Sequence, residues 1–369
     1  MKLAISKEQI INGLQAVQSV VSTRTTLAVL SNVLLRAEGN HLELTATDLD
    51  VTISSRVEAN VIRAGVTTLP VKKLFGLVRE LPAQEIEIEV DEKNVALIQS
   101  GPSFYKINGL SAEEFPPITQ FGEERKVKLP QEKVRSMLRK TSFAISNDEA
   151  RYVLNGIFFS LKEHKISMVA TDGRRLAMVE EEVDVPTESQ SQFIVPSKAI
   201  NELNRLLVAN GEMEIRFNAN QVAFTLQGEK GDSILLISKL IDGNYPNYRQ
   251  VIPAETKERI TLLREEFLQA LRRADLMTSE KSNSIKLNFG KNSLSITANS
   301  PDVGEARESL AMNYNGNEFS MAFNPAYMMD PLKALENDEI FLEFTDELSP
   351  AIVRVNEPFI YVIMPMRTN

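Results

Sequence analysis

The sequence predicts an α+β protein made of three tandem copies of one domain, each with two helices packed on a mainly antiparallel sheet. Three observations predict it: the chain repeats at intervals of 124 to 130 residues, each repeat has two stretches of helical apolar spacing, and alternating stretches fill the rest. The expected domains are residues 1–122, 127–253 and 258–369. A length of 369 residues is enough for two or three domains.

The repeat is clearest in three landmarks. The run LTATD at residues 44–48 returns as MVATD at 168–172, and more faintly as ITANS at 296–300. A proline opens an amphipathic stretch in each copy, and an aromatic-proline pair closes the first two copies; these residues are Pro70, Pro196 and Pro325, then Phe115-Pro116 and Tyr245-Pro246. Because proline lacks an N–H, we expect it in the first turn of each second helix.

The elements follow from the spacing of apolar residues. The first helix of each copy has them three or four positions apart, at Ile10, Leu14, Val17 and Val21, then Val134, Met137 and Leu138, then Phe267, Leu268 and Leu271. Strands are expected where apolar and polar residues alternate, as at 41–45, 85–90 and 221–226. Each domain therefore reads as helix, strands, helix, strands.

The charge distribution allows only a restricted kind of nucleic-acid binding. The net charge is −9, which argues against a broad basic surface. The six predicted helices nevertheless carry +5 together, which leaves −14 for the other residues. Two interpretations remain open. Either the helices are simply solvated and rich in lysine, or they form a mildly positive face that attracts phosphates without sequence preference.

The sequence contains little that suggests catalysis. It has no cysteine, only two histidines, and no glycine-rich phosphate-binding motif, so neither a metal nor a cofactor is expected. The match of residues 103–106 to S-x-x-K has no accompanying K-T-G. Asp48 and Asp172 are the best acid–base candidates, but an aspartate after threonine at a strand end more often forms a turn. With no signal peptide and no apolar run of membrane-spanning length, a soluble cytoplasmic protein that is not an enzyme is expected.

Three motifs, taken together with the repeat and the length, carry a resemblance. They read ATDGRRLA at residues 170–177, YPNYRQVIP at 245–253 and YVIMPMR at 361–367. The whole chain closely resembles the bacterial sliding clamps, the beta subunits of DNA polymerase III. The resemblance implies a head-to-tail homodimer in which six domains form a ring around duplex DNA, bound without sequence preference.

The resemblance also implies partners and a site for them. The replicative polymerase's catalytic subunit, the clamp loader, other polymerases and repair proteins would insert QLxLF-like peptides into a cleft between the second and third domains. The implied lining is Leu154, Thr171, Gly173, Arg174, Arg175, Leu176, Pro246, Arg249, Val251, Asn324, Tyr327, Val362, Met364, Pro365, Met366 and Arg367. Two methionines around a proline suit an adaptable apolar surface, and arginines suit polar or acidic peptide positions. On composition alone, Met364 and Met366 also fit ordinary strand core.

Two further sets of residues follow from the same resemblance. Arg24, Arg151, Tyr152 and Lys198 would face DNA, although they also fit plain surface positions. Tyr105 and Ile107, on an edge strand, would meet Leu276 and Met277, on a helix of the third domain, across the dimer interface. Two other classes of function stay open: a monomeric scaffold or ligand-binding protein of three repeats, and an enzyme that uses Asp48 and Asp172.

Overall fold

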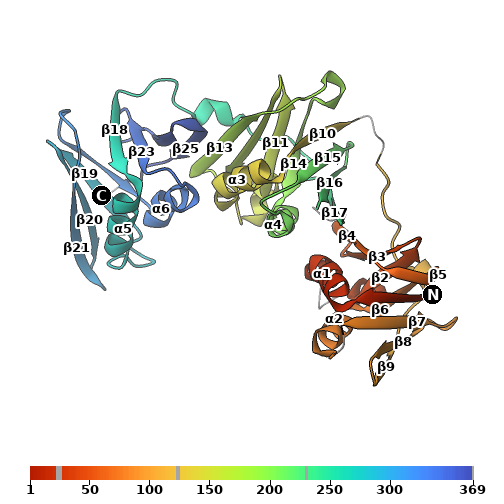
Figure 1. Ribbon diagram of the computed structural model, residues 1–369. Coiled ribbons are helices and arrows are strands. Elements are labelled where there is room, and N and C mark those ends of the chain that lie inside the picture. Colours follow the sequence, from red (N-terminus) through yellow and green to blue (C-terminus); the bar gives the residue numbers. More distant parts are fainter. Residues whose placement is uncertain (22–26, 83, 122–124, 229–231, 368–369) are drawn as a thin grey trace. The chain divides into compact units, whose positions relative to one another are not determined.

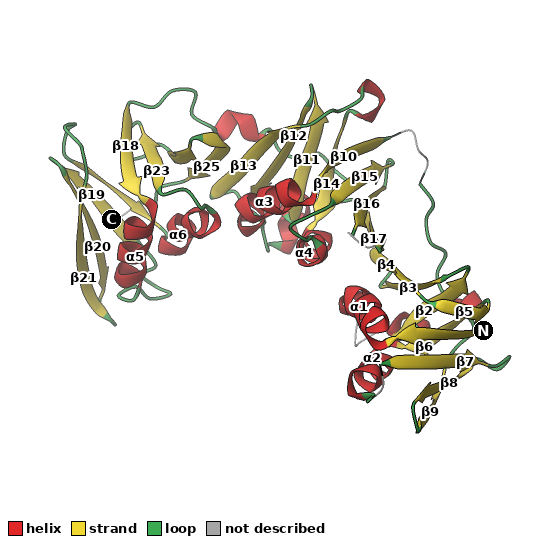
Figure 2. Cartoon of the chain, viewed as in Figure 1, coloured by secondary structure: helices red, strands yellow, loops and turns green. Residues whose placement is uncertain are grey.

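The computed structural model describes residues 1–21, 27–82, 84–121, 125–228 and 232–367, which form two compact units (Figures 1 and 2). The first unit comprises Met1–Arg135, Val183–Gln190 and Lys198–Ile241, and the second comprises Ser136–Glu182, Ser191–Ser197 and Asp242–Asn369. The middle third of the chain therefore contributes to both units. Arg24, a predicted DNA-facing residue, lies outside the described residues.

The first unit is built on two antiparallel sheets. A five-stranded sheet has the order β5-β1-β7-β8-β9, and an eight-stranded sheet has the order β10-β15-β16-β17-β4-β3-β2-β6. The strands are β1 (Lys2–Ser6), β2 (Asn32–Glu38), β3 (His41–Thr47), β4 (Val51–Glu58), β5 (Asn60–Arg63), β6 (Gly65–Pro70), β7 (Glu85–Val90), β8 (Val95–Ser100), β9 (Ser103–Asn108), β10 (Lys126–Pro130), β15 (Glu212–Phe217), β16 (Gln221–Gln227) and β17 (Ser233–Lys239).

The second unit repeats this plan. Its eight-stranded sheet has the order β14-β11-β12-β13-β25-β24-β23-β18, and its four-stranded sheet the order β21-β20-β19-β22. The strands are β11 (Gly156–Lys162), β12 (Lys165–Thr171), β13 (Arg175–Glu182), β14 (Ser191–Pro196), β18 (Glu258–Leu263), β19 (Ile285–Gly290), β20 (Ser293–Ser300), β21 (Gly304–Ala311), β22 (Phe319–Phe323), β23 (Glu339–Phe344), β24 (Ala351–Val355) and β25 (Glu357–Ile363). The prediction of mainly antiparallel sheets is confirmed.

Each eight-stranded sheet joins strands from two different repeats. In the first unit β17 pairs with β4, and we name this seam the first junction. In the second unit β25 pairs with β13, and we name this seam the second junction. Neighbouring repeats are thus joined by continuous backbone hydrogen bonding as well as by side-chain packing.

Six predicted helices are confirmed, with bounds close to those expected: α1 (Lys7–Val17), α2 (Val71–Glu80), α3 (Gln131–Thr141), α4 (Ser197–Leu206), α5 (Arg264–Asp275) and α6 (Pro325–Ala334). Figure 1 shows α1 beside α2 in the first unit and α5 beside α6 in the second. Ile10, Leu14 and Phe267 on their apolar faces are fully buried. Burial of each such side chain stabilises the fold by about 1.5–3 kcal/mol.

The expected role of proline in opening helices is only partly right. Pro325 stands at the start of α6, where Asn324 caps the helix by accepting from the N–H groups of Ala326 and Tyr327. Pro70 and Pro196 end strands β6 and β14 and directly precede the next helix, with Pro70 at the N-cap of α2. Both strands are edges of their eight-stranded sheets, and an edge strand tolerates proline because one of its sides has no neighbour to accept an N–H.

Candidate functional site

The turn between β12 and β13 is held by its own side chains. The Thr171 hydroxyl donates to the Arg175 carbonyl over 2.6 Å and accepts from the Gly173 N–H over 3.1 Å. Asp172 Oδ1 accepts from the N–H groups of Arg174 and Arg175 over 2.9 and 3.1 Å. Gly173 has φ +83°, which glycine adopts without strain. The ATDGR motif is therefore a preformed rigid turn.

The turn between β3 and β4 has the same design. Thr47 Oγ1 donates to the Val51 carbonyl over 3.1 Å, and Asp48 Oδ1 accepts from the N–H groups of Asp50 and Val51 over 3.1 and 2.9 Å. The interpretation of both aspartates as turn formers is confirmed, because each carboxylate binds the backbone of its own turn. Neither turn has the arrangement of an acid–base pair.

Arg175 points into the structure. Its Nε donates to Asp172 Oδ2 over 3.0 Å, one Nη donates to Asp330 Oδ2 over 2.6 Å, and the other donates to the Phe143 carbonyl over 2.6 Å. The guanidinium also lies 4.2 Å from the centre of the Tyr327 ring. With 9% of its side chain exposed, Arg175 ties the β12–β13 turn to α6. The sequence prediction that groups it with peptide-facing arginines overlooks this burial.

The C-terminal tail, residues 364–367, lies between two parts of the second unit. The Met364 N–H donates to the Arg174 carbonyl over 3.0 Å, and the Met366 N–H donates to the Ala322 carbonyl over 2.7 Å. Both methionine side chains face solvent, with 45% and 41% of their surface exposed. The alternative that they are strand core is therefore wrong, and the backbone presents two anchored apolar side chains.

The tail continues a strand whose own side chains are buried. Tyr361 on β25 is almost inaccessible, and its hydroxyl donates to the Tyr327 carbonyl over 2.7 Å. Burial raises the pKa of this phenol, so it stays protonated and remains a donor. Val362 is also buried, opposite Leu176 in the register. The tail thus emerges from a rigid base.

The second linker, residues 242–252, is attached to the same sheet by aromatic side chains. Tyr245 stacks on Phe158 of β11 at a centroid distance of 4.8 Å, and Tyr248 tilts against the same ring at 5.9 Å. Pro246, Arg249 and Val251 are exposed. The linker therefore adds exposed apolar and cationic groups beside a buried aromatic anchor.

The predicted cleft residues all lie within the second unit and fall into three groups by burial. The buried ones are Leu154, Thr171, Leu176 and Val362, and the exposed ones are Gly173, Arg174, Pro246, Arg249, Val251, Met364, Met366 and Arg367. Asn324, Tyr327 and Pro365 are half-buried, as is Arg175 as a whole residue, although only 9% of its side chain is exposed. The buried members carry the turn and the strand ends, and the exposed ones form the accessible surface.

One exposed apolar residue near these strand ends is absent from the sequence prediction. Leu348 is in the loop before β24, whose first residue, Ala351, pairs with Ile363 at the end of β25. Asp346 Oδ1 holds this loop by accepting from the N–H groups of Leu348 and Ser349. Only the register shows that the loop shares a sheet end with the tail. The sequence contains no motif that marks it.

The predicted DNA-facing residues are exposed but already bonded. Arg151 Nε donates to Asp148 Oδ2 over 2.9 Å, and its Nη1 donates to the Asp172 carbonyl over 2.8 Å. The Arg151 guanidinium and the Ala150 N–H hold the pKa of Asp148 below its usual range. In the first unit, Lys198 pairs with Asp48. Tyr152 is also exposed.

The predicted interface residues lie at sheet and helix ends. Tyr105 and Ile107 are on β9, which is an edge of the five-stranded sheet, so the edge-strand prediction is confirmed. Leu276 and Met277 follow α5 instead of lying on it, because the helix ends at Asp275. Leu276 is highly exposed, as is Phe104, which the sequence analysis missed.

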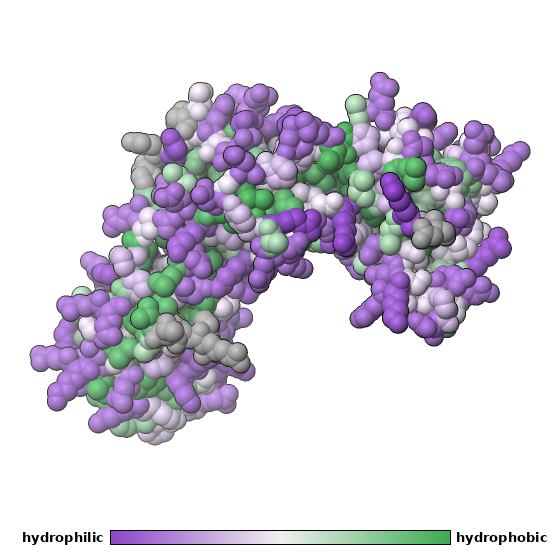
Figure 3. Space-filling view, turned by 180° about the vertical axis from the view of Figure 1, so that it is seen from behind, coloured by the Kyte–Doolittle hydropathy of each residue, from purple (hydrophilic) through white to green (hydrophobic). Residues whose placement is uncertain are grey.

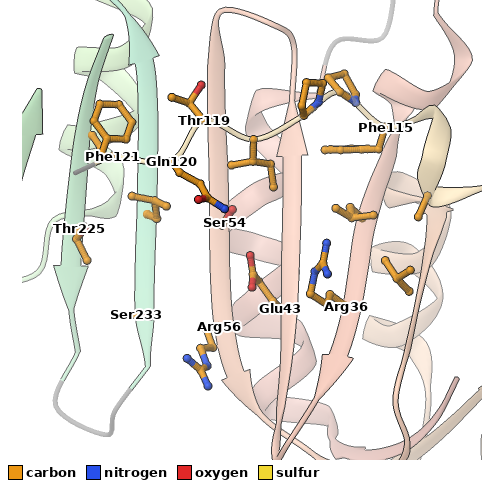
Figure 4. Close-up of a pocket in the computed structure, with 18 of the residues that line it drawn as sticks. Arg36, Glu43, Ser54, Arg56, Phe115, Thr119, Gln120, Phe121, Thr225 and Ser233 are labelled. Carbon is orange, nitrogen blue, oxygen red and sulfur yellow. The ribbon is translucent and has the colours of Figure 1, made fainter. Parts of the chain in front are cut away.

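A hollow of about 870 Å³ lies in the first unit, on the face of the eight-stranded sheet crossed by the first linker, residues 111–121 (Figure 4). Figure 4 shows Phe115 on the linker and Arg36, Glu43 and Arg56 on the strands beneath it. Glu43 stands opposite both arginines in the register. The lining as a whole mixes three arginines with two glutamates, so charges of both signs face the hollow.

Other kinds of site are not found within the described residues. No group of three or more histidine, aspartate or glutamate side chains there could hold a metal ion. No helix in the described part of the chain has the length and apolar character needed to span a bilayer. Figure 3 shows mostly hydrophilic residues over the visible face, with apolar residues between them.

Comparison with known proteins gives one consistent result. Family models match in chain order: the N-terminal domain of the DNA polymerase III beta subunit at residues 1–119, the central domain at 128–247 and the C-terminal domain at 249–367. The chain is 34% identical to the beta sliding clamp of Chlamydia pneumoniae over 367 residues, which covers 100% of this chain and 99% of that one. It is 36% identical to the beta sliding clamp of Haemophilus influenzae, with full coverage of both chains.

The fold agrees with these matches. The crystal structure of the DNA polymerase sliding clamp from Bacillus subtilis superposes with a TM-score of 0.94 at 31% identity, over 100% of both chains. Three tandem clamp domains thus account for the repeats, the joined sheets and the paired helices. This chain belongs to the family of DNA polymerase III beta subunits, the bacterial sliding clamps.

Proposed function

We propose that two copies of this chain close head to tail into a ring around duplex DNA, and that partner proteins bind the ring by short peptides at the second junction. As a sliding clamp the chain is a processivity factor and not an enzyme. Beyond that, we propose the two-chain assembly, the residues of its interface and of the peptide site, and the partners. It places the protein in the cytoplasm, where replication takes place.

The observation that carries the ring is the pattern of strand pairing. At the first junction the last strand of one repeat, β17, pairs with β4 of the repeat before it, and at the second junction β25 pairs with β13 in the same way. The equivalent strands left over are β9 and β21, which are edges within the described residues. A second copy supplies the missing partner of each, and two such pairings close the ring.

The two edges have the character of an interface. Phe104 and Tyr105 on β9 are 59% and 39% exposed. Beside β21, Val303 and Leu276 are also exposed, and Met277 lies next to Gly304. Uncovered edge strands with apolar side chains invite pairing with other chains, so proteins rarely leave them free. Covering them in a closed dimer removes the hazard.

The ring would hold DNA by topology more than by affinity. Lys198 pairs with Asp48, and Arg151 pairs with Asp148 and the Asp172 carbonyl, so each cation binds a phosphate only in competition with its own partner. A few contacts of this kind give weak, sequence-independent attraction. Weak attraction permits sliding.

The second junction would receive peptides of the QLxLF type from the polymerase, the loader and repair proteins. Met364, Met366 and Val251 offer apolar surface, and Arg174 and Arg249 offer exposed cations. Burial of one leucine and one phenylalanine contributes about 3–6 kcal/mol, and a few hydrogen bonds add about 1 kcal/mol each. Affinity near micromolar is expected, which suits partners that take turns.

Sedimentation equilibrium tests the assembly. A ring of two chains has a mass of about 83 kDa, twice the 41.3 kDa of one chain. A stable species of single-chain mass at micromolar concentration would favour the monomeric scaffold instead. Titration with a labelled QLxLF-type peptide tests the site separately, with one peptide expected per chain.

A further inference from the structure

The two junctions share one backbone arrangement. At the second junction the Met364 N–H donates to the Arg174 carbonyl over 3.0 Å, and at the first junction the Lys239 N–H donates to the Asp50 carbonyl over 3.0 Å. Each carbonyl belongs to the aspartate-stabilised turn described above. Met364 and Lys239 are therefore structural equivalents, and so are Arg174 and Asp50.

The strands below these turns match as well. Leu176 stands opposite Val362 in the register of the second junction, and Thr52 stands opposite Ile237 in the first. An aromatic-proline linker follows each turn-bearing repeat, with Tyr245-Pro246 in one and Phe115-Pro116 in the other. The turn, the paired strands and the linker of the peptide site, which we call the frame, are thus present at both junctions.

The side chains at the strand end and in the turn differ in chemical character between the two junctions. At the second junction the equivalent residues are the exposed, apolar Met364 and the exposed Arg174. At the first junction they are Lys239 and Asp50, which form an ion pair. Lys239 Nζ lies 3.0 Å from Asp50 Oδ1, and the pair bridges the strand end to the turn. Both side chains are more than half exposed, so the pair contributes little stability. Its clearer effect is to place charges at the edge of the first junction, where the second junction has an apolar side chain.

The strand residue below the turn is also more polar at the first junction. Leu176 is buried and apolar, whereas Thr52 at the equivalent position bonds the Thr47 hydroxyl over 2.8 Å. An apolar peptide side chain gains less binding free energy on contact with hydroxyl groups, because these groups lose water without gaining a new hydrogen-bond partner. The first junction is therefore poor in the surface that a leucine or phenylalanine anchor needs.

Leu49 marks a further difference between the two turns. It has φ +79°, close to the +83° of its equivalent Gly173. A leucine in this conformation is strained, and glycine is the usual residue. The Leu49 side chain is 46% exposed at this turn, whereas Gly173 presents no side chain at the equivalent position.

We propose that the first junction is a counterpart of the peptide site that takes no peptide, and that Leu49, Asp50, Thr52 and Lys239 prevent binding there. These four side chains limit each chain to one partner peptide, although the fold repeats the frame. The proposal rests on the proposed function of the second junction. It goes beyond that function by naming the residues that decide which junction takes peptides.

A graft tests the proposal in a chain whose second junction is disabled by Met364→Asp and Met366→Asp. The graft adds Leu49→Gly, Asp50→Arg, Thr52→Leu and Lys239→Met, which places the second junction's residues on the first frame. Fluorescence anisotropy with a labelled QLxLF-type peptide measures binding. We expect the graft to bind at least about tenfold more tightly than the disabled chain, the change that one added apolar anchor contributes.

The matched control keeps Leu49 and Thr52 and carries Asp50→Asn with Lys239→Gln, which removes the ion pair without supplying an apolar side chain. It should bind no better than the disabled chain. Circular dichroism confirms that each variant is folded, and a graft that fails to fold is replaced by Leu49→Gly with Lys239→Met. A folded graft without binding overturns the proposal. The unmodified chain separates the two claims, because its failure to bind peptide would refute the proposed function itself.

Discussion

At the scale of single residues, the two arginines of the ATDGRR motif have opposite roles. Arg175 is buried against Asp172, Asp330 and the Tyr327 ring. Arg174 contributes only backbone hydrogen bonds to the fold, and its side chain is exposed. Arg175 therefore ties the β12–β13 turn to α6, while the side chain of its neighbour faces solvent.

Exchange of each arginine for glutamine should separate these roles. Arg175→Gln leaves two carboxylates without their cation and should lower the free energy of unfolding by about 3 kcal/mol. Arg174→Gln should change it by less than about 0.5 kcal/mol, as at other exposed sites, while it weakens binding of an acidic peptide. Urea denaturation and peptide titration measure the two effects. Equal destabilisation by both variants would contradict the assignment.

A second residue-scale prediction concerns acid stability. The Lys140 ammonium beside Glu357 holds the pKa of this carboxyl below its usual 4.5. Because the folded pKa is the lower one, the ionised pair stabilises the fold above pH 4.5, and this contribution is lost as pH falls below that value. Glu357→Gln should therefore flatten the fall of the urea midpoint below pH 4.5. An unchanged slope would show that the pair does not contribute.

At the scale of elements, the edge strands matter most. β9 and β21 are the strands whose equivalents pair at the two junctions. Their backbone groups are ready to form the same ladder with another copy, and side chains such as Tyr105 add apolar area. The interface should consequently be sensitive to charge on one edge and insensitive to charge on the other edge of the same sheet.

Tyr105→Asp on β9 should convert the dimer to monomers, because it buries a charge in the new seam without a partner. Ile62→Asp is the matched control, since Ile62 is 60% exposed on β5, the opposite edge of the five-stranded sheet. Light scattering after size-exclusion chromatography reports the mass of each variant. If both variants remained dimers, β9 would not be the interface.

At the scale of the whole molecule, closure explains how a protein with a net charge of −9 can stay on DNA. Two or three phosphate contacts at a time give log K a slope of about −2 to −3 against log salt, too weak for stable binding. Retention then depends on whether the DNA has ends.

Clamp loaded onto a circular plasmid should survive moderate salt and be lost after the plasmid is cut once. Gel filtration of plasmid with labelled protein, before and after linearisation, measures this loss. Equal retention on circular and linear DNA would be inconsistent with a ring. The Tyr105→Asp variant serves as control and should be lost from both forms.

Much of the fold follows from local pattern. The periodicity of residues such as Ile10 and Phe267 predicts six helices to within a few residues, because an amphipathic stripe of that spacing buries itself only as a helix. The threonine-aspartate pairs predict both turns, because a short aspartate side chain reaches the backbone N–H groups two and three residues further on. The sequence by itself thus determined the repeats, the elements and the family.

Long-range pairing decided the rest. Three features depend on residues far apart in sequence. β17 and β25 complete the sheets of the preceding repeats, Arg175 turns inward, and Met364 is equivalent to Lys239. A sequence motif states which side chains are available, but hydrogen-bond register and burial determine where each one points. Only the tertiary structure therefore separated the arginine that holds the second junction together from the one beside it that faces solvent.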